Sequence, residues 1–383
     1  MRWGFVVGLV AVAASCSLLN PLDGYSGGDA AVSSGPITEA GTPDTTAPDA
    51  GNDPCLSARP PSRPPPTTGP DGGSTTIVAA LSTFSFADPG NPNAPNTRGY
   101  DLDRLCTCPP SCAESRTCVV SEERWARRAC APKAKTTCDY ARGVDNSGGD
   151  LMLTLTTALK TQFNVLPRLD TGQDGLLFQI EKYNGEPDDS SVEFGIFDSY
   201  GTNETQDAGP ANLKRDGTDR WTRDDAKNTE RGRFDLNAYV SGGVLVANIG
   251  TTIQIGQLVF PLSDAIISAK LVKRPNGVYA LEEGILAGRL RVDELLRSFE
   301  VIPSSLGPGK FLCDPNDPQF PGLRDTLCTA RDLPADPSLD GADTPCTGLS
   351  LALRFTADPA ALGELVKAPG RPRPCGEWQP KCD

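Results

Sequence analysis

The 383-residue chain contains no histidine. Without imidazole it cannot build a Ser-His-Asp triad, a Cys-His dyad, a histidine-ligated zinc site or a histidine-held haem. Positive charge is also scarce, because 36 basic residues face 49 acidic ones and leave a net charge of -13. Such a surface repels phosphate, and the composition therefore excludes nucleic acid as a partner.

The N-terminus lacks an apolar run long enough to cross a membrane. Its run at 5–14 covers ten residues, whereas a spanning helix needs about 20. This run follows Met1-Arg2, as in a signal peptide, and small residues precede Cys16 as they do in the lipobox of bacterial lipoproteins. Ala13 stands where that motif usually has Leu, and ordinary secretory cleavage after Ala11-Val12-Ala13 is the alternative.

Cysteine parity favours lipidation. The chain has 13 cysteines, and attaching lipid to Cys16 leaves an even number that can pair. We therefore predict a lipoprotein signal peptide at 1–15 and an acylated Cys16 that anchors the mature chain in a membrane. Ser17, rather than Asp, follows the cysteine. By resemblance to enteric sorting, this implies the outer membrane.

The next segment, 16–73, is rich in Ser, Thr, Pro, Gly and Asp, and from residue 23 onward it has almost no large apolar residue. It predicts a disordered tether, because such a composition cannot bury enough surface to offset its ordering entropy. The body, 74–383, contains many short strand-like segments between turn signals such as Asn184-Gly185. These features predict an antiparallel β-sandwich, jelly-roll-like, with few short helices.

Two segments have helical features. Residues 292–299 predict a short helix, whereas 151–163 fit either a helix or a strand.

The remaining cysteines fall into a cysteine-rich segment at 104–142, a C-terminal segment at 303–383 and one position in the tether. They are Cys106, Cys108, Cys112, Cys118, Cys130 and Cys138, then Cys313, Cys328, Cys346, Cys375 and Cys382, and finally Cys55. Disulfides are favoured over zinc or an iron-sulfur cluster, because the spacing is C-x-C and the exported compartment is oxidising. The five C-terminal cysteines cannot all pair among themselves. At least one must therefore bridge back to an earlier cysteine.

Acidic residues flank the cysteine-rich segment on both sides. In the extended stretch Asp101-Leu102-Asp103, alternation places both carboxylates on one face. Asp145 and Asn146 follow the segment and add oxygens of the kind that calcium prefers. If disulfides close the segment, these groups meet. The sequence therefore raises a calcium site at Asp101, Asp103, Asp145 and Asn146 and requires no other cofactor. The alternative is turn and cap chemistry.

Two further acidic patterns have a weaker structural context. Residues 170–181 match an EF-hand loop except at Gly172, but a turn rather than a helix follows, and a loop leading into a strand is the better interpretation. A histidine-free glycosidase needs only two facing carboxylates. Its candidate carboxylates are Glu181, Glu193, Asp198, Asp224 and Asp225, with Trp221 as a sugar-stacking ring.

The mature chain carries a series of short motifs. They are Cys16-Ser17-Leu18-Leu19, Gly99-Tyr100-Asp101-Leu102-Asp103, Gly143-Val144-Asp145-Asn146, Tyr183-Asn184-Gly185 and Tyr239-Val240-Ser241-Gly242-Gly243. In this order they resemble uncharacterised cysteine-rich outer-membrane lipoproteins of myxobacterial type. The resemblance implies an exported, lipid-anchored protein and transfers no catalytic residue. The chain departs from the expected pattern at Arg104, where glycine would follow the second Asp.

Together these features predict an outer-membrane lipoprotein whose body is a non-catalytic binding or structural module. An envelope glycan or protein is the expected partner. The alternative function is a carboxylate-dependent glycan hydrolase on a jelly-roll scaffold.

Overall fold

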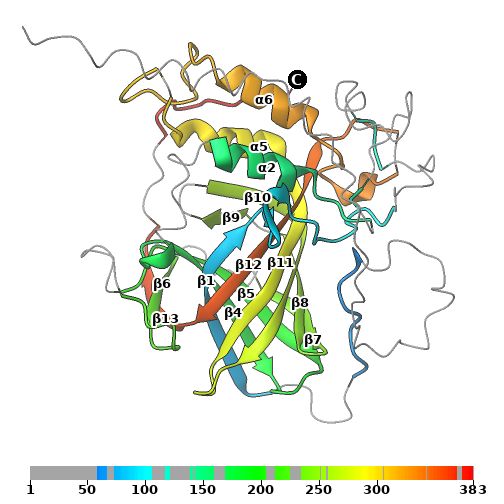
Figure 1. Ribbon diagram of the computed structural model, residues 1–383, viewed down its shortest axis with the longest axis vertical. Helices are drawn as coiled ribbons and strands as arrows, with labels where there is room; N and C mark the ends of the chain where they lie inside the picture. Colours follow the sequence, from blue (N-terminus) through cyan, green and yellow to red (C-terminus); the bar gives the residue numbers. More distant parts are fainter. Residues whose placement is uncertain are drawn as a thin grey trace, which may run out of the picture. The chain divides into compact units, whose positions relative to one another are not determined.

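Eight antiparallel strands close into a barrel at the centre of the computed structural model (Figure 1). Each strand pairs with the next barrel strand along the chain, and the last pairs with the first. The barrel strands are β1 (Thr75–Ser85), β4 (Gly175–Tyr183), β5 (Asp189–Ser199), β7 (Phe234–Ser241), β8 (Val244–Ile249), β10 (Leu258–Lys273), β11 (Tyr279–Arg291) and β12 (Gly348–Pro359). The prediction of mainly β structure is confirmed, at 46% strand and 14% helix, whereas the predicted jelly-roll-like β-sandwich is wrong because the sheet closes.

The structure describes residues 58–66, 73–105, 117–120, 139–140, 143–158, 169–203, 212–224, 234–250, 252–255, 258–304, 306–341, 343–368 and 373–382. The predictions for the signal peptide at 1–15, for lipidation of Cys16 and for the tether up to residue 57 lie outside these residues. Six cysteines of the predicted disulfide set also lie outside them, namely Cys55, Cys106, Cys108, Cys112, Cys130 and Cys138.

Pairing between the first and last strands closes the barrel. Phe84 of β1 lies opposite Phe355 of β12, so neither strand is left as an edge. The two long strands β10 and β11 carry bulges, where Asp264 and Glu283 adopt left-handed φ angles of 47° and 50°. Bulges bend a strand and increase its twist, which allows long strands to curl into a barrel.

The barrel interior is filled by apolar side chains. On β4, Leu176, Phe178 and Ile180 point into the main core, whereas Leu177 belongs to a second cluster on the outer face. The ring of Phe178 stacks on Phe355 with a centroid separation of 5.0 Å. An eight-stranded barrel is just wide enough for side chains to fill, and this interior is packed as a core.

Three helices cover one end of the barrel (Figure 1). They are α2 (Ser147–Ala158), α5 (Val292–Ser298) and α6 (Phe320–Thr329). Leu155, Leu296 and Leu327 from these helices join the main core. The short helix predicted at 292–299 is confirmed, and the ambiguous segment that begins at Leu151 is helical up to Ala158.

Smaller elements complete the fold. They are β2 (Ala87–Asp88), β3 (Asn91–Pro95), β6 (Arg220–Asp224), β9 (Thr252–Ile255), β13 (Ala361–Val366), η4 (Phe299–Val301) and η5 (Pro337–Leu339). Strands β6 and β13 form a parallel pair on the outside of the barrel. There Trp221 packs with Leu177 and Phe197.

Residues 58–66, within the predicted tether, lie against the outside of the barrel. The Arg63 guanidinium donates to the backbone carbonyls of Ser190 and Asn237 and lies 4.7 Å from the ring centroid of Tyr239. The Tyr239 hydroxyl in turn donates to the Pro61 carbonyl. Ala58, which is buried, accepts a hydrogen bond from the Asp101 amide. The proline-rich run is therefore docked where the structure describes it.

Three disulfides are present among the described cysteines. Cys313 pairs with Cys375 and Cys328 with Cys382, both within the C-terminal segment. Cys346 pairs with Cys118 across 228 residues. One C-terminal cysteine therefore reaches back into the cysteine-rich segment, as the odd number of C-terminal cysteines predicted. In the chain-entropy model, closing so long a loop strongly restricts the unfolded chain.

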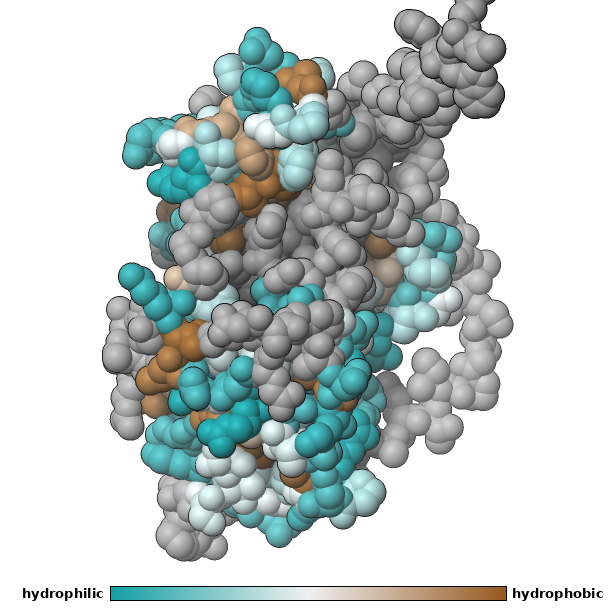
Figure 2. Space-filling view, turned by 90° about the vertical axis from the view of Figure 1, so that its left-hand side faces the viewer, coloured by the Kyte–Doolittle hydropathy of each residue, from teal (hydrophilic) through white to brown (hydrophobic). Residues whose placement is uncertain are grey.

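Within the described residues, no helix is long and apolar enough to cross a membrane. Among the residues that the structure describes, the exposed large hydrophobic ones are Leu236, Leu306, Leu339 and Leu365, which lie in separate stretches of the chain. On the face shown in Figure 2, the coloured hydrophobic residues form separate small groups among hydrophilic ones.

Candidate metal centre

One short segment of the chain runs along the outer wall of the barrel and carries two of the predicted site residues. Tyr100 and Leu102 pack on Ala287 of β11 and Ala352 of β12, and the Tyr100 hydroxyl hydrogen-bonds to Ser268 of β10. Because side chains alternate along an extended segment, Asp101 and Asp103 share the opposite face. This is the arrangement that the sequence pattern predicted.

The third carboxylate belongs to Asp145, which follows the cysteine-rich segment in the chain. The Asp145 amide donates to the Tyr100 carbonyl over 3.1 Å, and the Leu102 amide donates to Asp145 Oδ2 over 2.7 Å. These two bonds cross-link the segments that flank 104–142. The two ends of the cysteine-rich segment therefore meet.

Asp101, Asp103 and Asp145 form a compact group of ligand-type oxygens. One carboxylate oxygen of each lies within 4.8 Å of one oxygen of each of the others. Calcium binds oxygens at about 2.3–2.6 Å, so two ligands on opposite sides of one ion lie about 5 Å apart. The three carboxylates are therefore close enough to share one ion.

The group is also buried, with relative exposures of 7% for Asp101, 7% for Asp103 and 3% for Asp145. One oxygen of Asp103 accepts a hydrogen bond from the Leu105 amide, and Asp145 Oδ2 is held by Leu102. Oδ1 of Asp101 has no hydrogen-bond partner among the described residues. An unpaired buried acceptor costs about 1–3 kcal/mol, and more when it is charged. This oxygen therefore calls for a further partner.

Burial and mutual repulsion shift the acidity of all three groups. Burial raises the pKa of Asp103 to about 7, and the nearby Asp101 carboxyl adds to the rise. Burial raises the pKa of Asp145 well above its ordinary value, with added repulsion from Asp103 and Asp139. The pKa of Asp101 is raised by burial, although a hydrogen bond with Asp103 and the positive charge of Arg59 oppose the shift. The three groups resist carrying full negative charge together without a compensating cation.

The backbone conformation at Arg104 gives a physical reason for the glycine expected at this position. Its φ angle is 59°, in the left-handed region that glycine adopts at low cost. The backbone turns at this residue, and the Asp103 carboxylate accepts a hydrogen bond from the Leu105 amide across the turn. The chain therefore has an arginine in a strained backbone conformation at the position where the lipoprotein motif is expected to have glycine.

The side-chain amide of Asn146 is engaged by backbone groups. Its Oδ1 accepts from the Gly149 amide over 3.0 Å and from the Ala352 amide over 2.6 Å, and its Nδ2 donates to the Asn96 carbonyl. Asn146 therefore caps the N-terminus of α2 and fastens it to β12. This is the cap chemistry that the sequence left as an alternative.

Arg289 of β11 is a supporting residue that the sequence did not single out. Its side chain is fully buried, and Nη2 donates to the Leu102 carbonyl over 2.8 Å. Nη1 donates to the Pro334 carbonyl, and both groups pair with the Asp340 carboxylate. The available signal was a single arginine within the otherwise apolar stretch 284–290 of β11. Arg289 ties the segment that carries the acidic group to the barrel wall.

Thr117 also approaches the site. It is buried, and its hydroxyl lowers the pKa of Asp103. It directly precedes Cys118 of the long-range disulfide, and its carbonyl accepts from the Gly341 amide. The disulfide therefore holds Thr117 at the edge of the acidic group.

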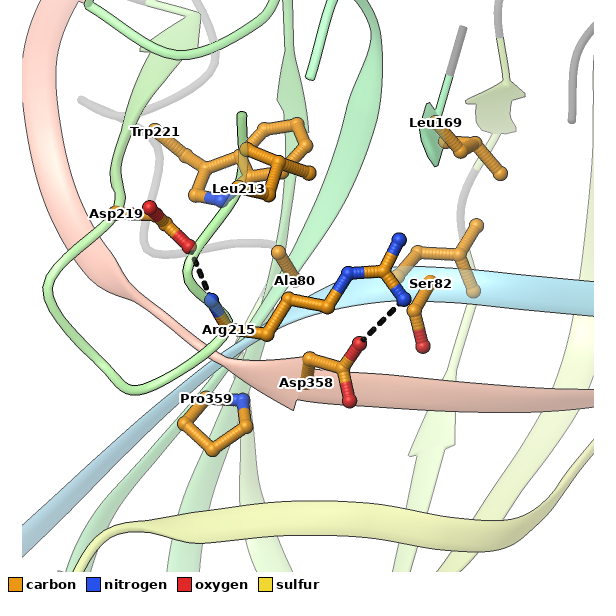
Figure 3. A pocket seen from close by; sticks show the side chains of 10 residues that line it. Ala80, Ser82, Leu169, Leu213, Arg215, Asp219, Trp221, Asp358 and Pro359 are labelled. Carbon is orange, nitrogen blue, oxygen red and sulfur yellow. Dashed lines mark hydrogen bonds and ion pairs between the residues drawn. The ribbon is translucent and has the colours of Figure 1, made fainter. Parts of the chain in front are cut away.

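The other acidic candidates have different surroundings. Asp170 pairs with Arg215 at 3.0 Å, and β4 begins at Gly175, which confirms the interpretation of 170–181 as a loop leading into a strand. Figure 3 shows Arg215 also reaching Asp358, at 3.4 Å, over a hollow beside Trp221. That hollow holds about 10 Å³, roughly the space of one water molecule.

The residues considered for a glycosidase, where the structure describes them, are engaged with the protein itself or buried. Glu193 pairs with Lys182, and Glu181 accepts from Gln179. Asp224 accepts from the Tyr200 hydroxyl over 3.2 Å. Asp198 is buried, Asp225 lies outside the described residues, and Trp221 is only 3% exposed. A ring so covered offers no surface for stacking on a sugar.

Comparison with protein-family models, with curated proteins and with solved structures finds no match to this chain.

Proposed function

We propose that the chain is an exported, lipid-anchored envelope protein whose barrel is a non-catalytic binding or structural module stabilised by one calcium ion. The observation that carries this proposal is the buried group of Asp101, Asp103 and Asp145, with its unpartnered Asp101 oxygen. In this proposal the ion stabilises the outer wall of the barrel, and the barrel presents a surface to an envelope glycan or protein.

The chemistry of the donors selects the ion. The chain has no histidine, and the described cysteines are paired in disulfides, so the soft ligands that zinc and copper prefer are not offered there. Three ionised carboxylates provide hard oxygen ligands and a formal charge of −3, part of which the positive charge of Arg59 offsets. A divalent ion with oxygen ligands balances the remainder, and calcium tolerates the irregular geometry of such a loop site better than magnesium does.

Calcium at this position would join separate parts of the chain. Asp101 and Asp103 precede the cysteine-rich segment, Asp145 follows it, and the Asp101 amide is bonded to Ala58 at the end of the docked proline-rich run. Binding that occurs only in the folded state adds about 2.7 kcal/mol of stability when the free ion is at a hundred times its Kd. The site therefore acts as a cross-link alongside the disulfides.

Isothermal titration of the purified chain with calcium tests the site. We expect binding of one ion per chain, and we expect Asp101→Asn to weaken it by at least about tenfold, because a ligand charge is lost. Asp325→Asn is the matched control, since the Asp325 side chain is 65% exposed and remote from the site in sequence. Absence of calcium binding to the parent chain, or equal affinity in Asp101→Asn, contradicts the proposal.

The raised pKa values give the site a pH dependence. Because Asp103 titrates near pH 7 when folded and near its ordinary value when unfolded, the folded state binds more protons between about pH 4 and pH 7. Without calcium, the free energy of unfolding should therefore fall as the pH rises through this window. Calcium displaces the protons, so saturating calcium should remove most of that fall. Urea unfolding at both ends of the window, with calcium and with a chelator, measures the difference.

The lipid anchor rests on the N-terminal sequence and has its own test. The described disulfides fit an oxidising compartment. We expect mass spectrometry of the membrane-extracted protein to find an acylated Cys16 as the first residue, and Cys16→Ser to leave the protein out of the membrane fraction. An unmodified N-terminus on the mature protein contradicts the anchor and leaves the calcium site untouched.

A further inference from the structure

Two β-bulges follow one another where strands β5 and β7 pair in the barrel wall. In the first, Ser190 and Ser191 of β5 lie opposite Tyr239 of β7 alone. In the second, Leu236 and Asn237 of β7 lie opposite one residue of β5. A bulge interrupts the ladder and leaves backbone groups of the extra residue unpaired. The backbone groups at both bulges therefore need hydrogen-bond partners from outside the ladder.

The barrel itself satisfies the amides of the two bulges. The Ser191 amide donates to Asp189 Oδ1 over 3.1 Å, and the Asn237 amide donates to Asp235 Oδ1 over 2.8 Å. Two carboxylates therefore lie beside the bulges and place negative charge on this part of the wall. Such a surface favours a positively charged partner.

The carbonyls of the same bulges are bound by a cation. Those of Ser190 and Asn237 accept hydrogen bonds from the two terminal nitrogens of the Arg63 guanidinium. The guanidinium also lies 4.7 Å from the ring centroid of Tyr239, whose hydroxyl donates to the Pro61 carbonyl. A planar guanidinium suits this combination of two acceptors and an aromatic ring, whereas an ammonium group is a single point charge.

Tyr239 belongs to the outer side of the wall. Its neighbours on β7, Ala238 and Val240, point into the main core, so Tyr239 points outward. The Tyr239 residue is nevertheless only 9% exposed, and the Arg63 side chain supplies part of its cover. Arg63 and the two residues before it are themselves exposed. A peptide on this wall is therefore in contact with solvent on its other side, where it can be exchanged.

The docked proline-rich run is recognised through groups that many peptides can offer. Its prolines carry no backbone N–H and cannot donate to the barrel. The hydrogen bonds to this wall use the Pro61 carbonyl and the Arg63 guanidinium. Any extended peptide with the pattern Pro-x-Arg presents the same two groups, and proline-rich peptides lose little conformational entropy when they bind.

We propose that the wall at the two bulges is a docking site for a proline-flanked arginine of a protein partner, and that residues 61–63 occupy it within the same chain. A free peptide with this pattern competes with the chain's own segment, whose effective concentration is on the order of millimolar. The proposal goes beyond the calcium site and does not depend on it.

Fluorescence anisotropy of a labelled peptide with the sequence of residues 60–66 tests the proposal. The full chain with Arg63→Ala lacks the competing guanidinium and should bind the peptide at least about tenfold more tightly than the parent chain does. A matched peptide with alanine in place of its arginine should bind at least about tenfold more weakly, and one with lysine should fall between the two. No binding to Arg63→Ala, equal binding of the arginine and alanine peptides, or equal binding by the parent chain overturns the proposal.

A variant of the wall locates the peptide. Tyr239→Phe, combined with Arg63→Ala, keeps the ring but removes the hydroxyl that bonds to the proline carbonyl, and it should weaken peptide binding by about fivefold. Tyr200→Phe in the same background is the matched control. It lies just past the other end of β5 and removes a hydroxyl that donates to Asp224, so peptide binding should stay as in Arg63→Ala alone. Unchanged affinity with Tyr239→Phe overturns the assignment of the peptide to this wall, and either result leaves the calcium site untouched.

Discussion

Replacing Arg289 by methionine is expected to lower the free energy of unfolding by about 3–5 kcal/mol, the usual loss when one partner of a buried ion pair is removed. Arg289 is fully buried, and its guanidinium satisfies the Asp340 carboxylate and the Leu102 and Pro334 carbonyls. Methionine fills similar space but leaves these acceptors without their donor. Urea unfolding followed by circular dichroism measures the loss.

The control for this substitution is Arg324→Met on α6. The Arg324 side chain is 42% exposed and, within the described part of the chain, pairs with its neighbour Asp325, so the change should stay within about 0.5 kcal/mol. Arg289→Met should also weaken calcium binding, because Leu102 lies between the two aspartates that Arg289 helps to position. A loss below about 1 kcal/mol would falsify the role of Arg289 as the anchor of this wall.

Opening the long-range disulfide should have the second large effect. Cys118→Ser together with Cys346→Ser removes a cross-link over 228 residues, and loss of a native disulfide costs about 2–5 kcal/mol. Because Thr117 precedes Cys118 and faces Asp103, the same double variant should lower calcium affinity. Thermal unfolding and calcium titration measure the two effects.

The chain provides a matched control for this prediction. Cys313 and Cys375 form a disulfide within the C-terminal segment, across only 62 residues. Replacing both by serine should also destabilise the fold, but calcium affinity should stay within about twofold, since distant sites behave independently. If the two double variants lose calcium affinity equally, the disulfide at Cys118 has no special connection to the site.

The local parts of this structure were predictable from the sequence because short-range patterns determine them. The alternation in Asp101-Leu102-Asp103 placed both carboxylates on one face, and the packing of Leu102 against the barrel confirms it. The helix at 292–299 followed from its spacing of apolar residues. Parity of the cysteines required a bridge out of the C-terminal segment, and Cys346 forms it.

The closure of the sheet was not predictable in the same way. In a sandwich and in a barrel, side chains alternate between the two faces of each strand, and the same turn signals separate the strands. They differ in whether the first strand finds the last, and here Phe84 pairs with Phe355. Contacts so far apart in sequence, and bulges such as the one at Asp264, leave no local signature that distinguishes the two folds.

The acidic site was partly predictable. Three of the four proposed residues meet, whereas the Asn146 side chain caps the N-terminus of α2. This role was not predicted, because the start of that helix was ambiguous in the sequence. Arg289 and Thr117 were missed, since a single polar residue far away in the chain carries no pattern that points to the site. The glycine expected at position 104 now has a physical reason, because Arg104 adopts a left-handed φ angle.

Calcium binding by the buried acidic group can be measured directly. Equilibrium dialysis of the purified chain against radioactive calcium at neutral pH tests it most directly. We expect one bound ion per chain in the parent protein and none in Asp101→Asn combined with Asp103→Asn, with Asp325→Asn behaving as the parent. A parent protein that retains no calcium, or a double variant that still retains one ion per chain, would show that this group is not a calcium site.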